Sequence, residues 1–253
     1  MPIIELRDVS KSYGGFDALR AVNMSVREGE VVCVLGDNGA GKSTLINILS
    51  GMHRHTAGEL LIDGQPTAFS SPRDALEVGI STVYQHLAIV DELSVWRNFF
   101  LGQEQSGVAG SLKTAEMKRI CAAQLAEMGV DIPDVDVEAG TLSGGQRQVV
   151  AIARAIHFGA RVVILDEPTA ALGVKQSGMV LRFIAAARDR GVAVVLVTHN
   201  PHHAFLVGDH FTILNLGRQV LDAPRSAVTL EELTRQMSGG AELVTLSHEL
   251  SRD

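Results

Sequence analysis

Residues 36–44 read Gly36-Asp37-Asn38-Gly39-Ala40-Gly41-Lys42-Ser43-Thr44. The apolar run 31–35 precedes this stretch and the largely apolar run 45–49 follows it, so the predicted order is strand, glycine-rich loop, helix. Glycines allow the backbone to curl until several N–H groups point inward, and the helix adds its positive N-terminal end. A polyphosphate fits such a loop, with Lys42 at the β and γ phosphates and the Ser43 hydroxyl on Mg²⁺. The alternative is a glycine turn without a ligand. Such a turn would not require the Lys-Ser pair or the preceding strand, so their presence disfavours it.

The composition describes a globular protein, either one large α/β domain or a core with a subdomain. Of its 253 residues, 46% are hydrophobic and 20% are charged, which excludes a disordered chain. The formal net charge of -7 argues against a nucleic-acid binder, because such proteins carry a basic face. Cys33 and Cys121 have neither disulfide nor metal spacing, so we expect two buried thiols in a reducing compartment.

The sequence gives no signal for a membrane span or for secretion. The N-terminus reaches the charged residue Glu5 too early for a signal peptide. The longest apolar run, 192–197, is well short of the roughly 18 residues that a bilayer requires. A role at a membrane would therefore depend on a partner.

Periodicity and turn residues predict an α/β fold. Asp63-Gly64 indicates a hairpin, and apolar strands that alternate with helices indicate a mostly parallel sheet covered on both faces. We expect strands at 3–6, 22–26, 59–62, 65–67, 80–84, 161–165, 192–197, 210–215 and 218–221, with a loop at 11–15. We expect helices at 73–78, 113–128, 146–157, 174–190 and 229–237.

Two acids follow the predicted strand at 161–165. Asp166 and Glu167 should therefore lie at the carboxyl edge of the sheet, where the glycine-rich loop also lies. Asp166 suits a ligand of the Mg²⁺ shell, and Glu167 suits a base that orients or activates water for attack on a γ phosphate. The alternative is an ordinary acid pair that caps the next turn, and the presence of the loop disfavours it.

The stretch Leu142-Ser143-Gly144-Gly145-Gln146 stands just before a predicted helix. Ser143 can cap that helix, and the two glycines allow a phosphate to approach its N-terminus. In its position between Lys42 and Asp166, the stretch resembles the signature of ATP-binding cassette ATPases. The resemblance covers residues 4–222, and it implies an ATPase with a P-loop NTPase fold that uses ATP and Mg²⁺.

The resemblance assigns roles to three further residues. Gln85 follows the strand at 80–84, where the family has a glutamine that contacts Mg²⁺ and the attacking water. His199 ends the last apolar strand, where the family has a switch histidine near the γ phosphate, and Tyr13 stands at the adenine-stacking position. The remaining histidines that we considered match no family position and are expected on the surface or in packing: His53, His55, His157, His202 and His203.

The resemblance also implies a domain organisation. One nucleotide-binding domain would span 1–253, with a RecA-like core and an antiparallel β subdomain at 1–91 and 160–237. A helical subdomain carrying the signature would be inserted at 92–159, and a tail would follow at 238–253.

Several stretches resemble the ATPases of bacterial monosaccharide importers, namely 36–43, 79–85, 98–102 and 170–173. Two features depart from that subgroup. Its typical members carry two cassettes in one chain, whereas this chain has room for one. Gly173 stands where most cassettes have the aspartate of the D-loop, which bears on how one ATP site communicates with the other.

The assembly implied by the resemblance is a dimer of cassettes, either two copies or this chain with another. Lys42 of one chain and Ser143 of the other would hold the same γ phosphate. We expect an importer ATPase on the cytoplasmic face of the bacterial inner membrane, bound to permease subunits and served by an external solute-binding protein. The alternatives are a transporter for a non-sugar solute and a soluble cassette ATPase acting on ribosomes or nucleic acid. The second class usually has a long coiled-coil insertion or a basic linker, which the sequence lacks.

Overall fold

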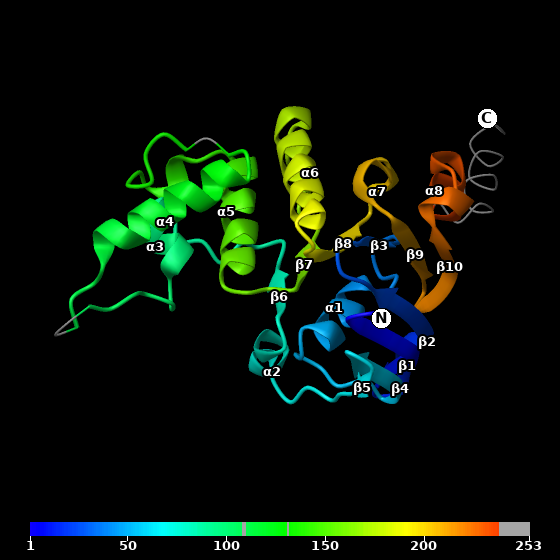
Figure 1. Ribbon diagram of the computed structural model, residues 1–253. Coiled ribbons are helices and arrows are strands. Elements are labelled where there is room, and N and C mark those ends of the chain that lie inside the picture. Colours follow the sequence, from blue (N-terminus) through cyan, green and yellow to red (C-terminus); the bar gives the residue numbers. More distant parts are fainter. Residues whose placement is uncertain (108–109, 131, 238–253) are drawn as a thin grey trace.

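The computed structural model describes residues 1–107, 110–130 and 132–237, and in them one mixed sheet of ten strands organises the fold (Figure 1). The strand order is β5-β4-β1-β2-β10-β9-β3-β8-β7-β6. The strands are β1 (Ile4–Tyr13), β2 (Phe16–Val26), β3 (Val31–Leu35), β4 (Ala57–Ile62), β5 (Gln65–Pro66), β6 (Ile80–Val83), β7 (Val162–Asp166), β8 (Ala193–Thr198), β9 (His210–Asn215) and β10 (Arg218–Pro224).

The half of the sheet that contains β3 is parallel, as predicted. β3 pairs with β8 on one side and β9 on the other, and β8, β7 and β6 follow in parallel. Every residue of β3 is buried, and its side chains alternate between two hydrophobic clusters. Val31, Cys33 and Leu35 face one cluster, whereas Val32 and Val34 face the other. Both faces of these strands are therefore covered, which explains their uninterrupted apolar sequence.

The N-terminal strands are longer than predicted, and the expected loop at 11–15 is wrong. β1 and β2 pair from Ile4↔Val26 out to Tyr13↔Phe16, so that only Gly14 and Gly15 form the turn. Both glycines have positive φ, 53° and 93°, which is the geometry that a two-residue hairpin turn requires. Lys11 and Ser12, before the turn, are polar and only half-buried on the strand, which is why they were interpreted as a loop.

Helices cover the two faces of the parallel strands. α1 packs on the same side as β1 and β2, whereas α6 and α7 lie on the opposite side (Figure 1). The helices are α1 (Lys42–Leu49), α2 (Pro72–Glu77), α3 (Val95–Phe100), α4 (Thr114–Glu127), α5 (Gly144–His157), α6 (Val174–Asp189), α7 (Pro201–Val207) and α8 (Leu230–Met237), with short 3-10 turns at Ala139–Thr141 and Arg225–Ala227.

α3, α4 and α5 form a helical insertion between β6 and β7 (Figure 1). Met117, Cys121 and Leu125 of α4 are buried, as their helical spacing predicts, and Cys33 is buried as well. α3 and α7 were not predicted. No helix of the described segments combines the length and apolar character that crossing a membrane would require. The predicted tail, 238–253, lies outside the described residues.

Candidate functional site

The glycine-rich loop joins β3 to α1 and lines a cavity of about 770 Å³. Gly36 and Gly41 have φ of +146° and +106°, a region that favours glycine. A Cβ at Gly36 would lie 2.4 Å from the carbonyl oxygen of Leu214, and one at Gly41 would lie 2.8 Å from that of Ala18. Conformation and close packing thus both require glycine at these two positions. The predicted binding residues that line the cavity are Asn38, Gly39, Ala40, Gly41, Lys42, Ser43 and Thr44.

Lys42 is a buried cation at the start of α1. Its Nζ donates hydrogen bonds to the carbonyl oxygens of Gly36, at 2.6 Å, and Asp37, at 3.0 Å. Burial lowers the pKa of Lys42, because the charged form loses its hydration, and the charges of Glu167, Asp37 and Asp166 oppose this shift. Lys42 is therefore a desolvated positive charge fixed inside the loop.

Asp166 ends β7 and lies within the electrostatic reach of Lys42, as the sequence predicts for the carboxyl edge of the sheet. Burial raises the pKa of Asp166, the neighbouring charge of Glu167 adds to the effect, and Lys42 opposes it. Ionised Asp166 is thus an unfavourably desolvated carboxylate, which a cation would stabilise.

The residues around Lys42 fit a magnesium ion. Ser43 is exposed and lines the cavity, and Asp166, within the electrostatic reach of Lys42, offers a carboxylate, so the donor set consists of oxygen atoms. Among the residues that the structure describes, no three His, Cys, Asp or Glu side chains cluster as metal ligands. Mg²⁺ does not need such a cluster, because it keeps several waters and phosphate oxygens as ligands.

Glu167 is held from both carboxylate oxygens. The Thr198 hydroxyl donates to Oε2 at 3.1 Å, and Nδ1 of His199 lies 2.8 Å from Oε1. Thr198 ends β8, next to β7 in the sheet, so the parallel register brings these residues to one edge. Glu167 also has φ of +49°, which costs about 1–3 kcal/mol for a non-glycine residue. Such strain at an oriented carboxylate is typical of a functional site.

Ser143 is the N-cap of α5. Its hydroxyl oxygen accepts a hydrogen bond from the Gln146 N–H at 3.3 Å, while the Gln146 side chain accepts one from the Ser143 N–H at 3.0 Å. A Cβ at Gly144 would lie 2.7 Å from the Leu172 side chain, and one at Gly145 would lie 3.1 Å from Gln176. The two glycines thus let α5 and the start of α6 pack closely. None of the residues 143–146 lines the cavity of the Lys42 loop.

Gln85 is exposed in the bend that follows β6, and no hydrogen bond of its side chain is present in the described part of the chain. Gly173 is the N-cap of α6, with open space where a side chain would begin. Tyr13 packs edge-on against His53 with ring centroids 5.8 Å apart, and it is not among the residues that line the cavity. The roles of Gln85 and Tyr13 stay predictions.

An apolar rim around the cavity was missed by the sequence analysis. Phe16, Leu216 and Val220 line the cavity, and they expose 68%, 77% and 44% of their surfaces. They come from β2, from the turn between β9 and β10, and from β10. Exposed apolar side chains of this size suit contact with a planar base. Their exposure and their convergence depend on the tertiary fold. The hydrogen bond from Thr198 to Glu167 was likewise not predicted.

Known proteins resemble this chain over most of its length. The family model described as ABC transporter matches residues 19–170. The chain is 40% identical to the xylose/arabinose import ATP-binding protein XylG of Sulfolobus acidocaldarius over 239 residues, which cover 94% of this chain and 95% of that protein. It is 43% identical to the fructose import ATP-binding protein FrcA of Rhizobium meliloti over 248 residues, 95% of each chain.

Solved structures share the fold. A dimeric, post-hydrolysis structure of the ATP-binding cassette MJ0796, bound to ADP and Pi, superimposes with a TM-score of 0.73 at 27% identity, covering 88% of this chain and 98% of that one. The two sugar-import relatives have nearly the length of this chain, so a single cassette is no anomaly among them. The chain carries the phosphate loop, the capped Ser143 helix and Glu167 in the order of the family. The chain therefore belongs to the ABC transporter family, as an ATP-binding cassette.

Proposed function

We propose that this chain is the ATPase subunit of an importer for a small sugar. The observation that carries the proposal is the carboxylate of Glu167, held by Thr198 and His199 at the same sheet edge as Lys42. ABC importer subunits hydrolyse ATP to ADP and phosphate, and the named relatives are sugar-import proteins. Likeness to XylG and FrcA supports a monosaccharide as the solute.

The chain's own residues divide the chemistry among them. Glycine N–H groups of the loop and the Lys42 ammonium bind the β and γ phosphates. Ser43 and Asp166 would hold Mg²⁺, with Gln85 completing its shell, and the ion would neutralise charge on the transferred phosphoryl group. Glu167 accepts a proton from the attacking water, while His199 and Thr198 keep the carboxylate aimed. Phe16 and Tyr13 are the aromatic candidates for the adenine.

The site is completed by a second cassette, which we propose to be a copy of this chain. Ser143, Gly144 and Gly145 form a helix N-terminus that can bind phosphate, yet they lie outside the cavity of Lys42. In a two-fold dimer, each γ phosphate would lie between Lys42 of one copy and Ser143 of the other. Hydrolysis would remove that bridge and open the dimer, because the contact differs between the two states.

The partners follow from the importer function. We propose that two permease subunits bind the cassettes on the cytoplasmic face of the cell membrane, and that a solute-binding protein delivers the sugar from outside. Likeness to import ATP-binding proteins supports this arrangement. Nucleic acid is not an expected partner.

The test is hydrolysis with and without the permease. The purified chain should hydrolyse ATP with a specific activity that rises with protein concentration, as a dimer requires, and the purified permease encoded with it should increase the rate. Sugar and solute-binding protein should increase it further in reconstituted vesicles. Salt-sensitive binding to ribosomes or DNA, without binding to the permease, would overturn the proposal.

A further inference from the structure

The loop at 167–173 joins β7 to α6 and has an unfavourable backbone conformation. Glu167 and Ala171 have φ of +49° and +58°, a region that residues other than glycine rarely occupy. Such a conformation persists only where surrounding contacts hold it. The first residue of the loop is tied to β8, because the Glu167 N–H donates to the carbonyl oxygen of Val197 at 2.8 Å. The rest of the loop needs contacts of its own.

One such contact comes from α7. Nδ1 of His203 lies 2.9 Å from the hydroxyl oxygen of Thr169, and this is the one hydrogen bond of the Thr169 side chain within the described part of the chain. Thr169 exposes only 7% of its surface, so water has little access to its hydroxyl. Removal of the imidazole would leave a buried polar group without a partner, which is unfavourable.

His203 is itself held in place by the start of α7. Its N–H donates to the side-chain oxygen of Asn200, the N-cap of the helix, at 3.1 Å. The Asn200 N–H in turn donates to the hydroxyl oxygen of Thr198 at 3.1 Å, and that hydroxyl donates to the Glu167 carboxylate. The first turn of α7 is therefore connected to the loop at two places, the carboxylate of Glu167 and the hydroxyl of Thr169.

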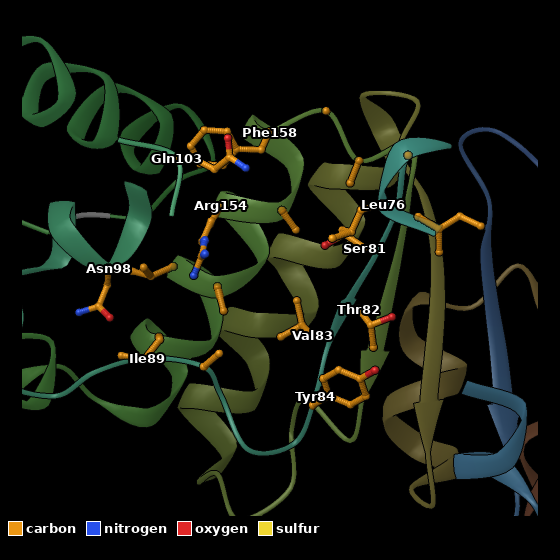
Figure 2. A pocket seen from close by; sticks show the side chains of 18 of the residues that line it. Leu76, Ser81, Thr82, Val83, Tyr84, Ile89, Asn98, Gln103, Arg154 and Phe158 are labelled. Atoms are coloured by element: carbon orange, nitrogen blue, oxygen red, sulfur yellow. The ribbon is translucent and has the colours of Figure 1, made fainter. Parts of the chain in front are cut away.

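The far end of the loop supports the helix that Ser143 caps. A Cβ at Gly144 would lie 2.7 Å from the Leu172 side chain, so the first turn of α5 packs directly on the loop. Farther along, α5 and β6 both line a cavity of about 290 Å³, with Arg154 on the wall of α5 and Val83 on that of β6 (Figure 2). The cavity reduces the contact of α5 with the sheet there. The contact at Leu172 therefore helps to set the position of Ser143.

We propose that His203 is a positioning residue, which fixes the loop through Thr169 and thereby orients both the Glu167 carboxylate and the helix of Ser143. One turn of α7 and the residue before it then act on the loop together, with His199 on the carboxylate and His203 on the backbone that carries it. The inference rests on the proposed function, because Glu167 is a base and Ser143 a phosphate ligand only in an ATPase.

The experiment uses substitutions that keep the shape of a side chain and change its polar atoms. His203→Leu and His203→Asn have the same shape, but only asparagine has a polar atom at the position of Nδ1. Thr169→Val removes the hydroxyl, whereas Thr169→Ser keeps it. His202→Leu, at an exposed position of the same helical turn, is the matched control. The kcat and KM for ATP hydrolysis and the melting temperature are measured for each. ATP-dependent self-association is measured by gel filtration after each is combined with Glu167→Gln.

We expect His203→Leu and Thr169→Val each to lower kcat by about tenfold and to change KM by less than about twofold, because a misplaced base weakens the transition state more than the binding of ATP. His203→Asn and Thr169→Ser should keep most of the turnover, and His202→Leu all of it. The combination of His203→Leu with Thr169→Val should be no slower than either alone, since both remove one bond. Self-association should weaken with His203→Leu and not with His203→Asn.

Full turnover in both His203→Leu and Thr169→Val would show that this bond does not position the loop, and the ATPase function would stand. Equal losses in His203→Leu and His203→Asn, or a loss explained by unfolding at the assay temperature, would make His203 a packing residue and overturn the proposal. A loss of turnover with unchanged self-association would overturn the part that concerns Ser143. If the unsubstituted chain does not hydrolyse ATP, both proposals fail.

Discussion

Nδ1 of His199 lies 2.8 Å from Oε1 of Glu167, on the side of the carboxylate opposite the Thr198 hydroxyl. The two partners follow each other at the end of β8, whereas Glu167 follows the neighbouring strand β7. Two adjacent parallel strands thus orient one carboxylate, and its direction does not depend on a flexible loop. If Glu167 is the base, as we propose, this arrangement prepares it for one reaction geometry.

Glu167→Gln should lower the turnover of ATP by about 10²–10⁴, because the amide cannot accept the proton of water. ATP binding should remain, and ATP-dependent dimers should accumulate because hydrolysis no longer opens them. Phosphate release and gel filtration with ATP measure the two effects. Thr198→Val, which removes one hydrogen bond to the carboxylate, should cost about tenfold. Normal turnover in Glu167→Gln would exclude this residue as the base.

Asp166→Asn should raise the free energy of unfolding near neutral pH while it removes Mg²⁺-dependent hydrolysis. Burial raises the pKa of Asp166 above its ordinary value, so the folded chain binds its proton more tightly than the unfolded chain does. Protonated Asp166 therefore stabilises the fold below the pKa that this group has in the unfolded chain. This stabilisation is lost as the pH rises through its pKa in the folded chain.

Denaturant titrations between pH 4 and pH 8 test this sign. The advantage of Asp166→Asn should shrink as the pH falls, because the carboxyl of the unsubstituted chain is then protonated as well. A variant that is less stable than the unsubstituted chain at neutral pH would contradict the prediction. Added Mg²⁺ and ATP should stabilise the unsubstituted chain more than the variant.

Phe16→Ala should weaken the binding of ATP more than the binding of inorganic triphosphate, since Phe16 lines the cavity and is largely exposed. Stacking of a base on an aromatic ring contributes about 1–3 kcal/mol, which corresponds to roughly five- to 150-fold in affinity. Titration of the monomer with ATP and with inorganic triphosphate separates the two ends of the ligand. Tyr13→Ala serves as the matched comparison, and a larger loss there would assign the base to Tyr13.

Gly173→Asp should be tolerated by the fold, because no atom lies within 4 Å of the position of its Cβ and because aspartate is a good N-cap. If an aspartate here links the two ATP sites, the Hill coefficient for ATP should rise. Gly36→Ala is the opposite case, since its Cβ would lie 2.4 Å from a carbonyl oxygen, and we expect ATP binding to be lost. An unchanged melting temperature for Gly36→Ala would show that the loop adapts.

The local parts of this molecule were readable from its sequence. Spacing and residue type predicted the loop around Lys42, the two acids at the end of β7 and the cap at Ser143, because each depends on neighbours in the chain. α7 also carries a local signal, an Asn200 cap followed by Pro201, which was overlooked. α3 carries a weaker signal, since its N-cap is Ser94, but nearly all of its residues are buried and no polar face reveals the helical period.

The tertiary parts were not readable. Phe16 was assigned to no predicted strand or site. Its place at the cavity depends on the hairpin of β1 and β2 meeting β10, where Gly217 accepts a hydrogen bond from the Arg20 N–H. The motif at 98–102 likewise does not reveal that the Asn98 side chain donates hydrogen bonds to the carbonyl oxygens of Val90, Leu93 and Ser94.

The separation of Ser143 from the cavity of Lys42 has a genetic consequence. In the proposed homodimer, a chain with Lys42→Ala and a chain with a disrupted Ser143 would each be inactive alone, since every site would lack one half. When both chains are made in one cell, mixed dimers contain one doubly damaged site and one intact site. Two null alleles of the same gene should therefore complement each other in transport-dependent growth, whereas two alleles damaged in the same half should not.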